Sequence, residues 1–485
     1  MFDPFLPVTE LARLIRTRAL SSTEVVTTYL NRIERLDPKV NAIVWRDADA
    51  SLAAAQQADA ALAAGAEVGP FHGVPIPIKD LTEAAGQPCF YGSLGTSDEP
   101  VTTSEPVVER LVAAGFVLMG RTAAPEAGTM TVTESRRFGV CRNPWDPSRS
   151  PGGSSGGAAA AVAAGLAPVA HASDGGGSIR VPASSCGLVG LKPSRGRVPV
   201  RVAGWEHAAT DGAETRTVRD AAAVLDVIGT PDPLAMYNAP RPSRPFTAEV
   251  GAPPGRLRIG LALEPPTGVA VDDECLRAAT ATATVLADMG HTVEPVAPLS
   301  YSERAVTGYL THIMDASVAQ LPYADPALAE PYLQFRMERA RRATAADYVT
   351  SALLLQLESR DVVAQFGRDF DLVLSPTMAT LPVPAGVLVA EANADPEGPR
   401  LTEMRMVSFT SWVNLAGLPA VSLPLHVSAE GLPVGTQLVA GPWQDDLLIR
   451  VASSLEEAMP WRSRRPPAFA EPVSAPRVGS GTPGD

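Results

Sequence analysis

Apolar and polar residues follow the periods of helices and strands along most of the chain. Over residues 21–36, apolar side chains recur three and four positions apart, and this spacing predicts an amphipathic helix. Ser22 or Thr23 is the expected N-cap, and the Asp37-Pro38 pair is expected to end the helix. The same reasoning predicts further helices over residues 49–64, 106–114, 156–165, 271–289, 303–320, 327–366 with breaks, and 445–458.

Short apolar segments between these helices predict strands. They cover residues 41–45, 74–78, 116–119, 168–172, 256–262, 291–296, 371–375, 420–424 and 434–440. Two prolines at 74–78 exclude a central position, so we expect an edge strand there, with Lys79 at its end. Strands that alternate with helices predict an α/β fold: a large, mixed, mostly parallel and twisted sheet, covered on both faces by helices.

The length of the chain allows one large buried core, because 485 residues exceed what an ordinary domain needs. We predict a single domain over residues 1–464, with an N-terminal helical part (1–70), a core (71–230) and a C-terminal part of the same sheet (255–464). The proline-rich residues 231–254 are the expected connector. Residues 465–485, rich in Pro, Gly and Ser, are predicted to form a disordered or surface-lying tail.

Composition narrows the class of function. A net charge of −13 argues against a dedicated nucleic-acid surface, and no secretory signal or membrane-spanning run is found in the sequence. Four cysteines without CxxC spacing are typical of free thiols in a reducing cytoplasm. The six histidines lack metal-ligand spacing, so neither a metal nor another cofactor is expected.

Residues 151–194 carry the most specific chemistry. Two loops, GGSSGG around Ser154 and DGGGS ending at Ser178, bracket an Ala-rich helix and a short strand. A hydroxyl at Ser154 or Ser155 lies in the positive field of the helix N-terminus, either as an ordinary N-cap or as a reactive group. The glycines before Ser178 form either a flexible turn or a nest of N–H groups for an anion. Ser178 at the end of such a nest is a candidate nucleophile.

Two other motif assignments apply to the same loops. No G-K-[ST] follows the glycines, which argues against a Walker-type phosphate site. The G-x-S-x-G pattern at 153–157 matches the nucleophile elbow of α/β-hydrolases, but the proline-broken residues before it do not predict the strand that an elbow requires.

A serine nucleophile needs a base. Histidine is the usual one, and His171 or His426 is a candidate, with Asp371 or Asp174 to orient it.

Lys79 is the alternative base. Burial in the apolar segment VPIPIKD would disfavour its ammonium form and supply a neutral amine. A surface lysine, or a partner of Asp80, is equally consistent with Lys79 taken alone.

From about Thr9 to Glu457, the chain resembles the amidase signature family. The resemblance rests on GVPIPIKD, GGSSGG and GGGSIR, and on GLKPSRGRVP, TRTVRDAAAVLDVI and NLAGLPAVSLPL further on. It implies that Lys79 is the catalytic base, that Ser154 is a bridging serine beside a cis peptide, and that Ser178, 24 residues later, is the nucleophile.

The resemblance also implies a cofactor-free mechanism through an acyl-enzyme on Ser178. The oxyanion hole maps to the backbone of Gly175, Gly176, Gly177 and Ser178. Ser155, Asp174 and Arg180 are expected to position the loop by hydrogen bonds. Because the base must be a neutral lysine, an alkaline pH optimum is expected.

The implied activity is hydrolysis of C–N bonds in small-molecule amides, anilides or carbamates. The loop SDGGGSIRVPAS, with RTAAPEAG and FGVCRNPWDP, is similar to a subgroup that contains 6-aminohexanoate cyclic-dimer (nylon oligomer) hydrolases, near aryl acylamidases and carbamate-cleaving relatives. One alternative is therefore a cyclic-dimer hydrolase. The other is the catalytic subunit of a glutamine-dependent tRNA amidotransferase, active only in a complex. Many relatives are homodimers, so a homodimer is expected, and the cysteine pattern predicts that it lies in the cytoplasm.

The substrate pocket is assigned less directly. The acyl side is expected at Gly128, Thr129, Met130 and Thr131, and the leaving-group side in the helical segment 300–360. Six apolar side chains of that segment are either pocket or core residues: Tyr301, Tyr309, Met314, Tyr323, Tyr332 and Phe335.

Overall fold

The computed structural model describes residues 2–470. An eight-stranded sheet forms its centre, and its strands in spatial order are β10 (Thr292–Pro295), β9 (Arg258–Leu261), β11 (Leu372–Pro376), β13 (Pro433–Ala440), β12 (Ala420–Val427), β7 (Val189–Lys192), β8 (Thr210–Thr215) and β6 (Ala170–Asp174). A smaller sheet has the order β1 (Ile43–Trp45), β3 (Val117–Thr122) and β2 (Pro75–Lys79), and β4 (Glu134–Ser135) pairs with β5 (Gly139–Val140). The predicted α/β class is confirmed, and β2 is an edge strand as expected.

The large sheet is mixed, but the expectation that it is mostly parallel is wrong. Only β10–β9 and β9–β11 pair in parallel within it, whereas the other neighbours are antiparallel. The strands β6 and β7, which flank α6 (Arg180–Cys186) in sequence, do run in the same direction, because both are antiparallel to β8 between them. In the same way β13 lies between β11 and β12. These two pairs of helix-linked strands are therefore parallel without being neighbours, whereas β9 and β10, which α8 links, are parallel and adjacent.

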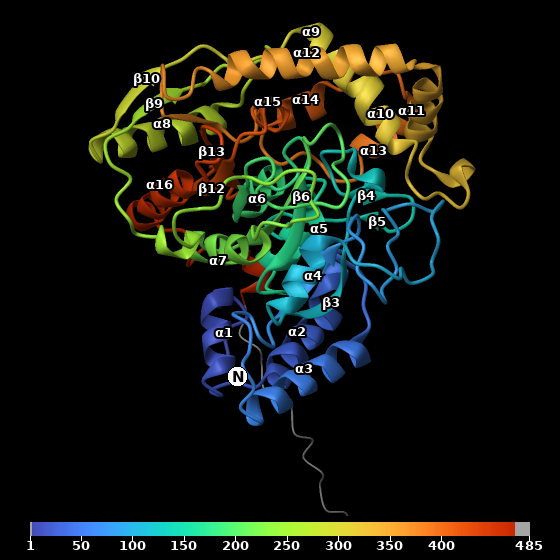
Figure 1. The fold of residues 1–485 in the computed structure, drawn as a ribbon, viewed down its shortest axis with the longest axis vertical. Helices are drawn as coiled ribbons and strands as arrows, with labels where there is room; N and C mark the ends of the chain where they lie inside the picture. The colour runs from blue at the N-terminus through green and yellow to red at the C-terminus, as the bar shows by residue number, and fades with distance from the viewer. Residues whose placement is uncertain (1, 471–485) are drawn as a thin grey trace, which may run out of the picture.

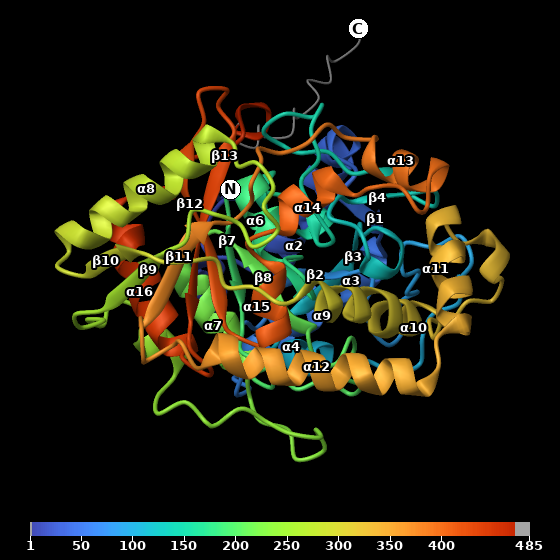
Figure 2. The ribbon, with the colours of Figure 1, turned by 90° about the horizontal axis from the view of Figure 1, so that it is seen from above.

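Helices cover both faces of this sheet. The helices α7 (Val218–Ile228), α8 (Asp273–Asp288) and α16 (Asp445–Ala458) lie on one face, where Val421 and Leu423 of β12 belong to the same buried cluster as Leu448 and Leu455 of α16. The opposite face packs against α6, which contacts α5 (Gly156–Ala163). Figure 2 shows α8 and α16 beside the β9–β13 end of the sheet.

The N-terminal part forms one end of the molecule, with α1 (Val8–Arg16), α2 (Ser22–Leu36) and α3 (Ala48–Ala63) around the small sheet (Figure 1). The predicted helix at 21–36 is confirmed, but its N-cap is Ser21. The reason is a capping box: the Ser21 hydroxyl accepts from the N–H of Glu24, whose carboxylate accepts from the N–H of Ser21. The remaining helices of this half are α4 (Pro106–Ala113) and the 3-10 turns at Asp37–Lys39 and Glu126–Gly128.

The predicted helices at 303–320 and 327–366 correspond to several shorter elements. These are α9 (Glu303–Gly308), a π-helical turn (η4, Tyr309–Met314), α10 (Asp315–Val318), the 3-10 turn Pro326–Leu328, α11 (Pro331–Arg342) and α12 (Ala345–Val363). α12 lies at the end of the molecule opposite α1–α3 (Figure 1). The chain continues through α13 (Leu388–Ala394), α14 (Leu401–Val407) and α15 (Ser411–Ala416). None of the helices in residues 2–470 is both long enough and apolar enough to span a membrane.

The described residues extend past the predicted start of the tail at residue 465. Pro467–Phe469 form a 3-10 turn and the ring of Phe469 is buried, because this aromatic side chain joins the main apolar cluster. The rest of the predicted tail, 471–485, lies outside the described residues.

Helix α5, which follows the Ser154 loop, is held at its C-terminus by a buried arginine of α2. Arg32 donates from Nε to the carbonyl of Gly165 at 2.7 Å and from Nη2 to the carbonyl of Ala164 at 2.9 Å. Carbonyls at a helix C-terminus have no partner within the helix and attract cations. Arg32 therefore fixes the helix whose other end carries Ser154 and Ser155.

Replacement of this arginine should destabilise the protein. Arg32→Met leaves the buried carbonyls of Ala164 and Gly165 without donors, each at a cost of about 1–3 kcal/mol, and should lower the melting temperature by about 1 °C for each kcal/mol in a chain of 485 residues, which is about 2–6 °C in total. Arg35→Met is the matched control, since Arg35 lies on the same helix and is exposed. Calorimetry of both variants decides the matter, and equal melting temperatures would contradict this role of Arg32.

Candidate active site

Three segments that are distant in sequence meet at Lys79. β2 ends at Lys79 and packs against β6, and α5 contacts β2. The GGSSGG loop enters α5, and the glycine loop follows β6 directly. The peptide bond between Gly153 and Ser154 is cis, as the resemblance implied.

The ammonium or amine group of Lys79 is surrounded by serine oxygens. Its Nζ lies 2.8 Å from Oγ of Ser154 and 2.7 Å from Oγ of Ser155. Oγ and the carbonyl oxygen of Ser173 lie 3.0 and 3.2 Å away. The lysine is completely buried, so the surface position that its sequence context also allowed is excluded. The carboxylate of Asp80 accepts hydrogen bonds from the backbone N–H groups of Phe90 and Gly92 and not from Lys79.

Burial governs the charge of Lys79. Removal from water disfavours the ammonium and lowers the pKa of Lys79 to about 7, although the negative field of Asp174, Asp211 and Glu214 acts in the opposite direction. The carboxyl of Glu214 is itself fully buried, and this burial raises its pKa well above the usual range. A substantial fraction of Lys79 is consequently a neutral amine near neutral pH.

Sequence reasoning did not identify Ser173 as part of this cluster. Ser173 and His171 project from the same face of β6, since side chains alternate along a strand, and Asp174 projects from the other. The predicted strand ended at residue 172 and so left Ser173 out. Had it been extended to Asp174, the alternation of side chains would have placed Ser173 on the same face as His171.

The glycine loop is held by the carboxylate of Asp174. Its Oδ1 accepts from the N–H of Gly177 at 2.7 Å, and its Oδ2 accepts from the N–H of Ile179 at 3.1 Å. Arg180 closes the loop with two further bonds, from Nε and Nη2, each 2.9 Å long. The expected positioning role of Asp174 and Arg180 therefore has a direct geometric basis.

The Asp174–Arg180 pair is buried and fully bonded. Arg180 also donates to the side-chain oxygens of Gln437, at 2.7 Å, and Asn414. Burial alone would raise the pKa of Asp174, but the charge of Arg180 and these hydrogen bonds hold it below the usual range. The carboxylate stays ionised at all working pH values, so the loop keeps its anchor.

The backbone amides of the loop differ in their availability. The N–H of Gly177 is engaged by Asp174, whereas those of Gly175, Gly176 and Ser178 have no hydrogen-bond acceptor among the described residues. Gly177 has φ +135°, and a Cβ at this position would lie 2.4 Å from Oγ1 of Thr410, so both backbone and space require glycine. Ser178 is half-buried, and its carbonyl accepts from the N–H of Ser155 at 3.2 Å.

The predicted acyl-side residues lie close to these serines. A Cβ on Gly128 would be 3.5 Å from Oγ of Ser154. The hydroxyl of Thr129 bonds to that of Tyr332 at 3.1 Å, and the hydroxyl of Thr131 contacts Sδ of Met406 at 3.3 Å. Met130 is buried in the apolar cluster that also holds Tyr332.

The aromatic residues of segment 300–360 separate into two groups. Tyr332 and Tyr323 belong to the cluster of Met130, whereas Tyr309, Met314 and Tyr301 belong to another that contains Trp205. Phe335 lies beneath the guanidinium of Arg339. Two apolar regions with different residues are therefore present.

The alternative histidine bases are occupied elsewhere. His171 contacts Asp211 at 3.1 Å and accepts from the backbone N–H of Lys79 at 3.4 Å. His426 contacts Glu274 at 2.8 Å, and Asp371 binds Arg258. No strand leads directly into the GGSSGG loop, so the nucleophile-elbow assignment also lacks its structural context.

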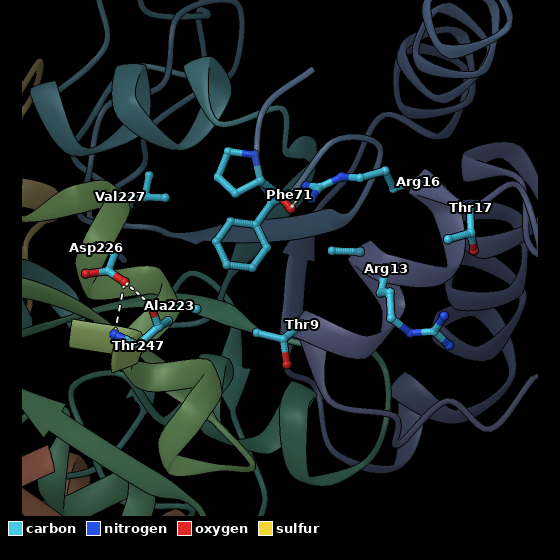
Figure 3. Close-up of a pocket in the computed structure, with 11 residues that line it drawn as sticks. Thr9, Arg13, Arg16, Thr17, Phe71, Ala223, Asp226, Val227 and Thr247 are labelled. Atoms are coloured by element: carbon cyan, nitrogen blue, oxygen red, sulfur yellow. Dashed lines mark hydrogen bonds between the residues drawn. The ribbon is translucent and has the colours of Figure 1, made fainter. Parts of the chain in front are cut away.

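The rest of the described chain adds neither a metal cluster nor a disulfide. Residues 2–470 contain no cluster of three or more His, Cys, Asp or Glu side chains with a geometry for metal binding. The four cysteines are unpaired and buried. A cavity of about 360 Å³ lies beside α1 and α7 (Figure 3). Its lining, which includes Thr9, Phe71 and Asp226, contains none of the predicted site residues.

Comparison with known proteins agrees with the geometry. The family model described as "Amidase" matches residues 24–449. The 6-aminohexanoate-cyclic-dimer hydrolase of Pseudomonas sp. (strain NK87) is 36% identical over 490 residues, which cover 96% of this chain and 97% of that protein. The acylamidase of Rhodococcus erythropolis is 34% identical, with coverage of 95% and 97%.

A solved structure extends the agreement to three dimensions. The structure of a 6-aminohexanoate cyclic dimer hydrolase superposes with a TM-score of 0.90 at 34% identity, covering 96% of this chain and 99% of that one. The chain therefore belongs to the amidase signature family of amidohydrolases.

Proposed function

We propose that this protein hydrolyses the C–N bond of small-molecule amides through an acyl-enzyme on Ser178, with Ser154 and Lys79 as proton carriers. The observation that carries the proposal is the buried Lys79 amine at 2.8 Å from Ser154 and 2.7 Å from Ser155. A buried lysine without a carboxylate partner supplies a base that water-exposed lysines do not provide.

Acylation begins with proton transfer. Neutral Lys79 accepts the proton of Ser154, and Ser154 accepts the proton of Ser178 as Oγ of Ser178 attacks the substrate carbonyl. The tetrahedral intermediate carries its negative charge on the former carbonyl oxygen. We assign the oxyanion hole to the free N–H groups of Gly175, Gly176 and Ser178.

The leaving nitrogen then needs a proton, because an amine anion is a very poor leaving group. Ser154 donates its proton to the nitrogen and regains one from Lys79, so that the C–N bond breaks and the amine departs. Water attacks the acyl-enzyme along the same path in reverse: its proton passes to Ser154 and Lys79, and Ser178 recovers its own. The products are a carboxylic acid and an amine.

The substrate class follows from the relatives. Their names include a cyclic-dimer hydrolase, an acylamidase and a bacterial aryl acylamidase, which supports small amides and anilides as substrates, with a cyclic dimer of 6-aminohexanoate as a specific candidate. Carbamates are included because their carbonyl and leaving amine present the same geometry to Ser178. Location in the cytoplasm and assembly as a homodimer stay predictions.

Removal of the nucleophile should abolish turnover. Ser178→Ala should lower kcat by about 10³-fold or more on a panel that contains a primary amide, an anilide, an aryl carbamate, a cyclic amide dimer and glutamine. Release of amine or ammonia by the purified chain is measured at pH 8–9.

The panel also separates the alternatives. Turnover of the cyclic dimer above the other substrates would favour a cyclic-dimer hydrolase, and activity confined to glutamine, or absent throughout, would favour a subunit that needs partners. Residual turnover by a folded Ser178→Ala variant would contradict the nucleophile assignment.

Activity should rise with pH as Lys79 loses its proton. The ammonium cannot accept a proton from Ser154, so kcat/KM should be low at acidic pH, rise through about 7 and reach a plateau above it. A pH profile of kcat/KM for an anilide measures this limb, and an optimum near pH 5 would contradict it.

A second buried lysine provides the control. Lys192 also has a pKa lowered to about 7 by burial, and its Nζ donates to the carbonyl of Pro193 at 2.8 Å. Lys192→Gln should keep the ascending limb, whereas Lys79→Met should remove activity at every pH. If instead Lys192→Gln displaced the limb, the titration would belong to Lys192.

A further inference from the structure

Gly175 is the first glycine of the loop. A neighbouring side chain, and not its backbone conformation, leaves no room for a side chain at this position. A Cβ at Gly175 would lie 2.5 Å from Cζ3 and 2.6 Å from Cε3 of Trp205. Its φ is not in the left-handed region, unlike the φ of Gly177. The indole of Trp205 therefore occupies the space that a side chain at residue 175 would fill.

Trp205 is held against the loop by a short strap, residues 205–208. All of Trp205, Glu206 and His207 have positive φ values, between 50° and 61°. The N–H of Ala208 donates to the carbonyl of Trp205 at 3.1 Å. The hydroxyl of Tyr348 in α12 donates to the carboxylate of Glu206, which ties the strap to the helical segment.

The strap shares its anchor with the glycine loop. Nδ2 of Asn414 donates to the carbonyl of Ala208 at 3.0 Å and also to Oδ1 of Asp174 at 2.9 Å. Movement of the indole relative to the loop is therefore restricted by one amide that binds both segments.

The indole also faces apolar side chains of the helical segment. Trp205 packs against the buried cluster that contains Tyr309, Ile313 and Met314 of the π-helical turn. Met130, on the predicted acyl side, belongs to a different cluster. Trp205 thus lies between an oxyanion-hole residue and the region expected to receive the leaving group.

We propose that Trp205 is the specificity-determining wall of the leaving-group site and that it favours flat, aromatic amines over small ones. This inference rests on the proposed function, since the wall is defined relative to attack by Ser178. An indole edge beside Gly175 gives a planar amine an aromatic surface, and aromatic pairs gain binding energy beyond their buried area. Ammonia, as the leaving group of a primary amide, cannot use that surface.

The test compares substrates that differ on one side of the scissile bond only. 4-Nitroacetanilide and acetamide share the acetyl group, and 4-nitrobutyranilide shares the nitroaniline. Trp205→Ala should lower kcat/KM about tenfold for both anilides, change the value for acetamide by less than about twofold, and leave the ratio of the two anilides unchanged. Trp443→Ala, which removes a half-exposed indole, is the control and should change none of these values.

A double-mutant cycle tests the contact itself. Gly175→Ser should cost anilide activity when Trp205 is present, because the new Cβ displaces the indole, and should add little loss in the Trp205→Ala background. Equal losses for anilides and acetamide, a change in the ratio of the two anilides, or additive effects of the two substitutions would each overturn the proposal.

Labelling of Ser178 by phenylmethanesulfonyl fluoride keeps this test separate from the proposed function. If the parent protein is not labelled, the nucleophile assignment fails. The role of Trp205 alone fails under a different outcome. In that case the Trp205 and Gly175 variants are labelled at the parental rate and melt at the parental temperature, but Trp205→Ala keeps the preference for anilides.

Discussion

The buried ion pair between Asp174 and Arg180 is the interaction on which the site depends. It joins the end of β6 to the first turn of α6, and between them it fixes the glycine loop. Asn414 and Gln437 bring α15 and β13 to the same pair. A buried pair of this kind is weak evidence for stability, because desolvation offsets its attraction, but loss of one partner leaves an uncompensated charge. Its clear consequence here is geometric: it engages the N–H of Gly177, whereas three other loop amides have no acceptor among the described residues.

The second constraint is the exclusion of water from Lys79. A lysine in water carries a proton at neutral pH, whereas this one lies among serine hydroxyls and a backbone carbonyl. Of the carboxylates that raise its pKa, Asp174 is bound to Arg180 and Asp211 to His171, so neither forms an ion pair with the amine. The same packing that builds the core therefore sets the chemistry of the amine.

The sheet shows where pattern reasoning reaches its limit. The alternation of strands and helices correctly indicated an α/β fold, but the mostly parallel sheet inferred from it is wrong, since most neighbours in the large sheet are antiparallel. It could not indicate that β8 is inserted between β6 and β7, or β13 between β11 and β12, because strand adjacency is decided by pairing across long separations in sequence. Neither β7 nor β8 was predicted, and both are short and interrupted by glycine or polar residues.

By itself, the sequence determined the family and the candidate residues Lys79, Ser154 and Ser178, because each lies in a short motif whose meaning is local. The tertiary structure decided what surrounds them. Asn414 and Trp205 contact residues of the glycine loop from separate segments, and no local pattern marks them; Ser173 lies on β6 itself, where only the strand alternation marks it. Likewise the pKa of Lys79 depends on burial, which is a property of the packed molecule and cannot be read from the neighbours of a residue in the chain.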